Sequence, residues 1–269
     1  MNMGEAYLKF HEAERQLLLE QHFSEATLKH YLDTLADLNA QSPVDSLIQC
    51  YYPGIQYPMH LRAKTSDIHN FYQLLVLNEY GAIQLTDPKI IIDLGAYVGY
   101  AAIYFASRYP QCKIICVEPS KRNYELLKIN TKPYPNIHII NTAIWSHSTS
   151  LKITGNVGGD WGTIVSECAP NDEGAFAALA LEDLILQNDI QKIDLLKVDI
   201  EGSEKQLFCN NTQGWLKMVE WVSCETHDRF IPGCSQAYFE LFESTGHFEK
   251  IQSGEYFIFR KNHGATLPV

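Results

Sequence analysis

Carboxylates, glycines and one histidine stand at points of this sequence where an apolar run ends and a polar segment begins. The clearest case is residues 90–99, in which an apolar run is followed by Asp93 and then by Gly95 and Gly99. Glycines between a strand and a helix let backbone N–H groups approach a ligand closely. Glu118 follows the next apolar run, 23 residues after Gly95 (118 − 95 = 23). An acidic residue at that separation is a common partner of ribose hydroxyls, so the spacing predicts a binding site for a nucleotide-like cofactor.

The spacing of the glycines indicates which cofactor fits. A dinucleotide-binding fold has the pattern Gly-x-Gly-x-x-Gly, because the pyrophosphate lies almost against the backbone. Here Tyr97 and Tyr100 occupy the second and third glycine positions. Their rings block a pyrophosphate but leave room for the amino-acid end of S-adenosylmethionine, which carries no phosphate. We therefore expect S-adenosylmethionine as the cofactor, and an NAD-dependent oxidoreductase is the less favoured alternative.

The residues expected to hold this cofactor divide into three roles. The glycine loop approaches the methionine part, Glu118 binds the ribose hydroxyls, and the small apolar pair Ala143 and Ile144 flanks the adenine ring. The full set of expected cofactor residues is Asp93, Gly95, Ala96, Tyr97, Gly99, Glu118, Pro119, Ala143, Ile144 and Asp199.

Asp199 follows a second buried apolar segment, residues 193–198, and Glu201 and Glu204 come soon after it. Acidic groups are favourable near the N-terminus of a helix, and this accounts for Glu201 and Glu204. It accounts less well for Asp199, which is expected at the end of a strand and directed into the ligand crevice. We predict a cofactor-binding or catalytic role for Asp199.

One histidine follows the next apolar segment, residues 221–224, and lies between Glu225 and Asp228. An imidazole with the ordinary pKa of about 6.5 can take a proton from a hydroxyl at neutral pH. The loop that carries His227 is expected at the same sheet edge as Asp199. We predict that His227 is the general base, oriented by Glu225 or Asp199, for an in-line methyl transfer from the sulfonium. The alternative is a structural histidine held by Glu225 and Asp228.

The elements that must position these residues alternate between apolar strands and helices. A run that is apolar on both faces, such as residues 90–92, is typical of a parallel strand buried within a sheet. Residues 248–252 and 256–260 predict a closing antiparallel hairpin, which is typical of methyltransferase sheets. We therefore predict an α/β protein with a doubly wound, Rossmann-like and mostly parallel sheet. The other expected strands are residues 113–117, 136–140, 193–198 and 221–224.

The first 60 residues differ from this pattern. Residues 5–40 carry apolar side chains at three- and four-residue spacing, which predicts amphipathic helices. Residues 41–60 contain three prolines and a glycine and read as a connector. We therefore divide the chain into an N-terminal helical extension and connector, residues 1–60, and a cofactor-binding domain, residues 61–269.

Two further segments have a predicted role near the site. A helix is expected over residues 68–80, and the Thr65-Ser66-Asp67 segment before it either caps that helix or lies, together with Arg62, beside the methionine end of the cofactor. Both interpretations stay open. Residues 151–154 and 162–165 predict a hairpin, and the glycine-rich segment between them, residues 158–162, is a candidate flap that faces the substrate.

Composition excludes several classes of function. The formal net charge is −11, which argues against a nucleic-acid partner because phosphate contacts need clustered Lys and Arg. No apolar stretch is long enough for a membrane span, and the first ten residues do not resemble a secretory leader. The seven cysteines are scattered, which fits reduced thiols in a cytoplasmic protein. The oligomeric state does not follow from these patterns.

Residues 61–260 resemble the FkbM-type family of S-adenosylmethionine-dependent methyltransferases. The most specific matching piece is Asp-Ile-Glu-Gly at residues 199–202, whereas the glycine loop is common to the whole superfamily. The remaining matching pieces are Arg62 with residues 65–67, residues 93–99, residues 117–119, Asn141 with Ala143, residues 197–198, and Glu225 with residues 227–228.

The resemblance implies O-methyl transfer to a hydroxyl of a sugar, a glycan or a secondary metabolite. A catalytically silent protein that binds the cofactor and serves as an interaction partner is the alternative. Some related sugar methyltransferases use a divalent ion bound by carboxylates. The acids Asp199, Glu225 and Asp228 allow such an ion here, but the sequence does not require it, and we assign no metal ligand.

Overall fold

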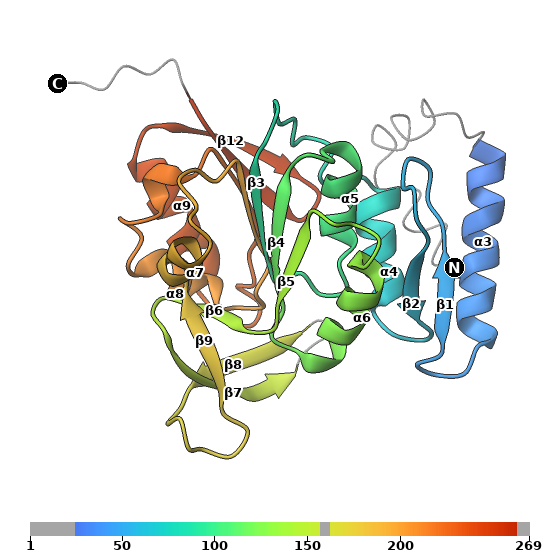
Figure 1. The fold of residues 1–269 in the computed structure, drawn as a ribbon, viewed down its shortest axis with the longest axis horizontal. Helices are drawn as coiled ribbons and strands as arrows, with labels where there is room; N and C mark the ends of the chain where they lie inside the picture. Colours follow the sequence, from blue (N-terminus) through green and yellow to red (C-terminus); the bar gives the residue numbers. More distant parts are fainter. Residues whose placement is uncertain (1–24, 157–161, 263–269) are drawn as a thin grey trace.

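The computed structural model describes residues 25–156 and 162–262, and a seven-stranded sheet lies at its centre (Figure 1). The strand order is β12-β13-β11-β10-β3-β4-β5. The central five strands are parallel, and β13 pairs antiparallel with β11 and with β12. The predicted α/β class, the mostly parallel sheet and the closing antiparallel hairpin are therefore confirmed. The strands are β3 (Ile90–Leu94), β4 (Lys113–Val117), β5 (Ile137–Ile140), β10 (Leu195–Val198), β11 (Trp221–Glu225), β12 (Phe248–Ser253) and β13 (Tyr256–Lys261).

The central strands are apolar on both faces because helices cover the sheet on both sides (Figure 1). In β3, Ile91 packs into one hydrophobic core and its neighbour Ile92 into the other. The strand order reverses between β3 and β10, and such a switch point is where ligands bind in open α/β sheets. The first core is covered by α4 (Asp67–Phe71), α5 (Tyr100–Arg108) and α6 (Lys121–Thr131), the second by α7 (Leu181–Gln187), α8 (Glu204–Cys209) and α9 (Cys234–Ser244).

A second, four-stranded sheet follows β5 and lies below the central sheet in Figure 1. The predicted hairpin is present in it, as an antiparallel pair of β7 and β8. The sequence analysis did not anticipate that a further strand pairs with this hairpin and with the segment after β5. Residues 158–161 of the candidate flap, which was expected over residues 158–162, lie outside the described residues. The strands, in their order across the sheet, are β6 (Ala143–Trp145), β9 (Phe176–Ala180), β7 (Thr149–Asn156) and β8 (Thr163–Glu167).

From residue 25 on, the described N-terminal part contains the helix α3 (Glu25–Gln41) and a hairpin where a connector was expected. The hairpin consists of β1 (Leu47–Cys50) and β2 (Met59–Arg62), which pair antiparallel. Strand β2 spans the expected boundary between residues 60 and 61 and packs against α4 and α6. The rest of the expected N-terminal helices, residues 5–24, lies outside the described residues.

The helix expected over residues 68–80 is shorter than predicted. Helix α4 continues as a single π-helical segment, Tyr72–Val76, and Asn78 then adopts a positive φ of 51° that ends the helix. Within the described ranges, no helix is long and apolar enough to cross a membrane. All seven cysteines are free thiols.

Candidate active site

A cavity of about 240 Å³ opens at the carboxyl ends of β3, β4, β10 and β11. Parallel strands bring their carboxyl ends to one edge of the sheet, so residues far apart in the sequence meet there. Apolar side chains and acids from both halves of the sheet line this cavity. The lining residues that the sequence analysis had selected are Gly95, Tyr97, Glu118, Pro119, Ala143, Ile144, Asp199 and Glu225.

Glu118 is the buried acid on the β4 side of the cavity. Its Oε2 accepts a hydrogen bond from the backbone N–H of Tyr97, and its Oε1 accepts one from Ser120, both at 2.9 Å. Burial raises the pKa of Glu118 to about 7, although these N–H groups act in the opposite direction. Oε1 also accepts a 3.5 Å hydrogen bond from Asn123 Nδ2, whereas Oε2 keeps a second lone pair that can accept from a ligand. Glu118 is therefore placed and oriented as an acceptor for ligand hydroxyls.

Three of the expected cofactor residues do not line the cavity. Asp93 is buried within β3 and pairs with Lys197 at 3.0 Å. The backbone N–H of Ala96 donates to Val117 O at 3.0 Å, so it joins the turn to β4. Gly99 adopts a φ of 94° at the start of α5, and a Cβ there would lie 2.7 Å from Leu127 Cδ1 of α6. These three residues support the glycine loop on the side that faces away from the cavity.

Gly95 lines the cavity, but the structure gives a different reason for the glycine from the one expected. Its φ is +75°, and a Cβ at this position would lie 1.7 Å from the carbonyl oxygen of Asp199. The close approach is thus between the ends of β3 and β10, and not only between the loop and a ligand. A side chain at Gly95 would separate these two strand ends.

The segment before α4 supports the glycine loop through Tyr97. Asp67 is fully buried, forms an ion pair with Arg62 at 2.7 Å and accepts a 2.5 Å hydrogen bond from the Tyr97 hydroxyl. Ser66 is the N-cap residue of α4, but its side chain makes no capping bond and lies 2.9 Å from the same hydroxyl. Thr65 Oγ1 accepts the Asp67 N–H at 3.2 Å. Arg62, Thr65 and Asp67 stay behind the loop and do not line the cavity.

His227 follows β11 and is only 1% exposed. Its Nδ1 lies 2.9 Å from Glu204 Oε1. Glu204 also accepts the backbone N–H of Ile200 at 2.9 Å and that of Gly202 at 2.8 Å. The expectation that Glu204 begins a helix is correct but incomplete, because this acid closes the loop after β10 and orients the imidazole.

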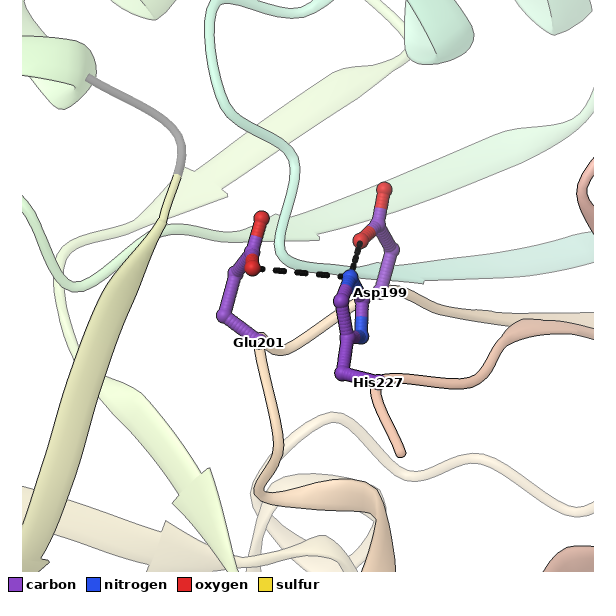
Figure 2. A group of neighbouring side chains, drawn as sticks. All are labelled: Asp199, Glu201 and His227. Atoms are coloured by element: carbon purple, nitrogen blue, oxygen red, sulfur yellow. Dashed lines mark ion pairs between the residues drawn. The ribbon is translucent and has the colours of Figure 1, made fainter. Parts of the chain in front are cut away.

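The other ring nitrogen of His227 faces three carboxylates, and Figure 2 shows two of them, those of Asp199 and Glu201. Nε2 lies 3.4 Å from Glu201 Oε2, 3.5 Å from Glu225 Oε1 and 3.8 Å from Asp199 Oδ1. Burial alone would lower the pKa of His227, but Glu204 and Glu225 raise it to about 12. The three acids line the cavity and the imidazole does not. The role of His227 as general base stays a prediction, and the acids are the groups that face the ligand space.

Burial and mutual repulsion act on the acids of this group. Burial, reinforced by Asp199, raises the pKa of Glu201 to about 8 and that of Glu225 to about 7. Asp228 is not among them, because its oxygens accept the N–H groups of Gly233 and Ser235 at the start of α9.

Lys197 is the buried cation beneath the cavity, and the sequence analysis gave it no role. Burial acts to lower its pKa, but the carboxylates of Asp93 and Asp199, at 3.0 and 3.5 Å, raise it well above the ordinary value. Its Nζ also donates to Gly95 O at 2.7 Å. The sequence did contain a signal for this role, because a lysine near the end of a buried apolar strand needs an acidic partner, and Asp199 follows two residues later. Lys197 ties β3, β10 and the glycine loop together.

The fold and the site define a class of protein: a Rossmann-like α/β protein with an acid-lined cavity at the switch point of its sheet, which is where such folds bind ribose-containing cofactors. The chain belongs to the FkbM methyltransferase family, whose domain matches residues 93–244. It is therefore an S-adenosylmethionine-dependent methyltransferase, and the oxidoreductase alternative is set aside.

Similar proteins carry related descriptions. The methyltransferase sdnD of Sordaria araneosa is 24% identical over 181 residues, which cover 55% of this chain and 70% of that protein. Among solved structures, the precorrin-6y C5,15-methyltransferase of Geobacter metallireducens is 13% identical with a TM-score of 0.41, over 69% of this chain and 86% of that one. The fibrillarin of Aeropyrum pernix, solved with natively bound S-adenosylmethionine, is 11% identical with a TM-score of 0.39, over 66% of this chain and 67% of that one.

The chemistry of the cavity fits this cofactor. Glu118 offers acceptor oxygens for ribose hydroxyls, and Ala143 and Ile144 offer apolar surface for a purine ring. S-adenosylmethionine carries a sulfonium and an ammonium group, and a cavity lined by excess acids attracts both. Among the described residues that line it, Arg229 is the single basic one. The acids are Glu118, Asp199, Glu201, Glu225 and Glu255.

Proposed function

We propose that this methyltransferase transfers the methyl group to a hydroxyl oxygen of a small-molecule acceptor, a sugar, a glycan or a secondary metabolite. One observation carries the proposal. Glu118, the proposed ribose acceptor, lines one cavity together with Asp199 and Glu225, which supports a site where a donor methyl group, an acceptor hydroxyl and a proton acceptor come together.

S-adenosylmethionine, when bound, supplies an activated methyl group, so the protein must position the acceptor oxygen and remove its proton. Glu118 and the pair Ala143 and Ile144 fix one end of the cavity. At the other end, Asp199 and Glu225 face the ligand space, and either carboxylate can accept the proton of a hydroxyl placed against it. His227, behind them, holds the carboxylates in place. A metal ion is not required by this chemistry and would be an addition to it.

The test is a measurement of S-adenosylhomocysteine formation with the full chain, S-adenosylmethionine and a panel of sugars, glycosides, phenols and polyols. We expect turnover with hydroxyl acceptors and none with the matched deoxy or O-methylated compounds. Glu225→Gln should lower turnover by about 10²–10⁴, the usual range for general-base catalysis, with cofactor affinity nearly unchanged. The matched control is Glu125→Gln, on the exposed face of α6.

Three results would contradict the proposal. Equal turnover of Glu225→Gln and the unmodified protein would remove the assigned proton acceptor. Binding of S-adenosylmethionine without turnover on any hydroxyl would favour the silent cofactor-binding alternative, and turnover only with amines or thiols would assign a different acceptor atom.

A further inference from the structure

A compact set of metal-ligating atoms lies at the acceptor end of the cavity. One atom each of Asp199, Glu201 and His227 lies within 4.8 Å of the other two. Figure 2 shows the imidazole and both carboxylates directed toward one point, from the loops after β10 and β11. We propose that Asp199, Glu201 and His227 bind one divalent cation, and that Glu225 supplies a fourth ligand.

The distances between His227 and the surrounding carboxylates fit ligands of a shared cation better than direct hydrogen bonds. His227 Nε2 lies 3.4 to 3.8 Å from the oxygens of Glu201, Glu225 and Asp199, beyond the usual range of about 2.7–3.2 Å for an N–H···O hydrogen bond. Ligand atoms about 2.1 Å from one metal ion at angles near 90–110° are roughly 3.0–3.5 Å apart. A small inward movement of these side chains is enough to complete the coordination.

Two buried groups point independently to a ligand at this place. Glu201 Oε2 is buried and has no hydrogen-bond partner within the described part of the chain. His227 is 1% exposed, and Glu204, itself fully buried, engages its Nδ1 at 2.9 Å. A carboxylate that accepts from Nδ1–H leaves Nε2 facing the other acids, where a metal ion can take the place of the Nε2 proton, and this arrangement recurs behind metal-bound histidines.

The charge of the cluster also favours a cation. Asp199, Glu201, Glu204 and Glu225 surround one imidazole, and buried like charges are costly unless they are paired. Lys197 reaches Asp199 at 3.5 Å, but it is closer to Asp93, at 3.0 Å. Carboxylate ligands suit Mn²⁺ and Mg²⁺, and an imidazole suits Fe²⁺ and Zn²⁺, so the mixed set favours Mn²⁺ or Fe²⁺ over Ca²⁺.

The place of the cation gives it a role in the proposed function. It would lie beside the place of the acceptor oxygen, and a Lewis acid there orients a hydroxyl and makes its proton more acidic. The role of the cation in catalysis rests on the proposed function, that is, on a hydroxyl acceptor. The cation site itself does not, because binding of the cation is measured without cofactor or acceptor. Vicinal hydroxyls, as in a sugar or a catechol, could then bind through both oxygens.

The experiment is a Mn²⁺ titration of the chelator-treated full chain, followed by electron paramagnetic resonance. We expect one Mn²⁺ per chain, bound at least about tenfold more weakly by Glu201→Gln and by Asp199→Asn, as ligand loss requires. The matched control is Glu255→Gln, an acid that lines the same cavity outside the cluster and should change the affinity by less than about twofold. In the unmodified protein, Mn²⁺ should also broaden the NMR signals of the His227 ring. This measurement does not depend on whether a variant folds.

Three results would overturn the cation site. The first is the absence of stoichiometric Mn²⁺ binding together with sharp His227 signals. The second is unchanged affinity in a folded Glu201→Gln variant. The third is an equal loss in Glu255→Gln, which would indicate diffuse attraction by acidic charge. Failure of methyl transfer with Mn²⁺ binding intact would instead count against the proposed acceptor chemistry.

Discussion

Replacing Glu118 with alanine is expected to weaken S-adenosylmethionine binding by about 1.5–3 kcal/mol, the range for hydrogen bonds to a charged group. This corresponds to a rise in Kd of roughly 10- to 150-fold. The structure supports a strong interaction because Glu118 is 5% exposed, so water does not compete for its oxygens, and because it lines the cavity, where a ligand hydroxyl can reach it. Its oxygens already accept the N–H groups of Tyr97 and Ser120, both at 2.9 Å, so the carboxylate cannot rotate away from the ligand.

The same carboxylate makes binding depend on pH. Burial raises the pKa of Glu118 from 4.5 to about 7, so the ligand-free protein holds this proton at pH 6. Ligand hydroxyls donate to the ionised form, which lowers the pKa, and binding therefore releases the proton. Affinity should fall as the pH drops below about 7, by at most about tenfold per pH unit. Above that pH the contribution of Glu118 should be constant.

Isothermal titration calorimetry of the full chain at pH 8 and pH 6 measures both effects, and two buffers with different ionisation enthalpies count the released protons. The control is Glu125→Ala, an exposed acid on α6. Thermal unfolding establishes that the variants fold. A folded Glu118→Ala protein with unchanged Kd would refute the ribose assignment. An affinity of the unmodified protein that does not change between pH 6 and 8 would refute the pKa argument.

Two other substitutions test the framework behind the site. Lys197→Met leaves the carboxylates of Asp93 and Asp199 without the cation that lies 3.0 and 3.5 Å away, and should cost about 3–5 kcal/mol of unfolding free energy in urea titrations; an unchanged midpoint would show that the pair is not stabilising. Gly99→Ala places a Cβ 2.7 Å from Leu127 Cδ1 at a φ of +94° and should cost about 1–3 kcal/mol, whereas a variant as stable as the parent would show that α5 and α6 can separate without cost.

The parallel strands could be predicted because both of their faces are buried, so each strand is a continuous apolar run in the sequence. In β3, Ile91 and Ile92 enter different cores, so the strand must be apolar throughout. The closing hairpin was visible from the glycine of its turn, Gly254, which follows the last residue of β12 and has a φ of 57°. These patterns are local in the sequence, so they can be recognised without knowing which strands lie next to them.

The strands of the second sheet form because they pair with strands that are distant in the sequence, and a local residue pattern does not indicate such pairing. Strand β9 (Phe176–Ala180) contains three alanines, which favour helices, but it is a strand because it pairs with β6 and β7. Tertiary pairing decides such cases, since strand preference depends on context. The hairpin of β1 and β2 was missed for a related reason, because the prolines and glycine of its long loop indicated a connector.

At the site, spacing along the chain predicted which strand ends meet but not where each side chain points. Glu201 and Glu204 are three residues apart, yet Glu201 lines the cavity and Glu204 lies behind the imidazole. The positive φ of Glu201, 55°, turns the loop between them, and an Asp-Ile-Glu-Gly sequence does not reveal this. Asp228, equally acidic and next to His227, instead caps α9.

The position of Asp199 determines which substitutions separate binding from chemistry. Its backbone N–H donates to Leu94 O at 3.0 Å, and its carbonyl oxygen leaves no room for a Cβ on Gly95. Its carboxylate contacts Lys197 and accepts the Tyr256 hydroxyl at 3.2 Å. A change at Asp199 therefore disturbs the cofactor loop and the acceptor end together. Glu225, at the end of β11, has no such link to the glycine loop, so a loss of turnover without a loss of cofactor affinity is expected from Glu225→Gln and not from Asp199→Asn.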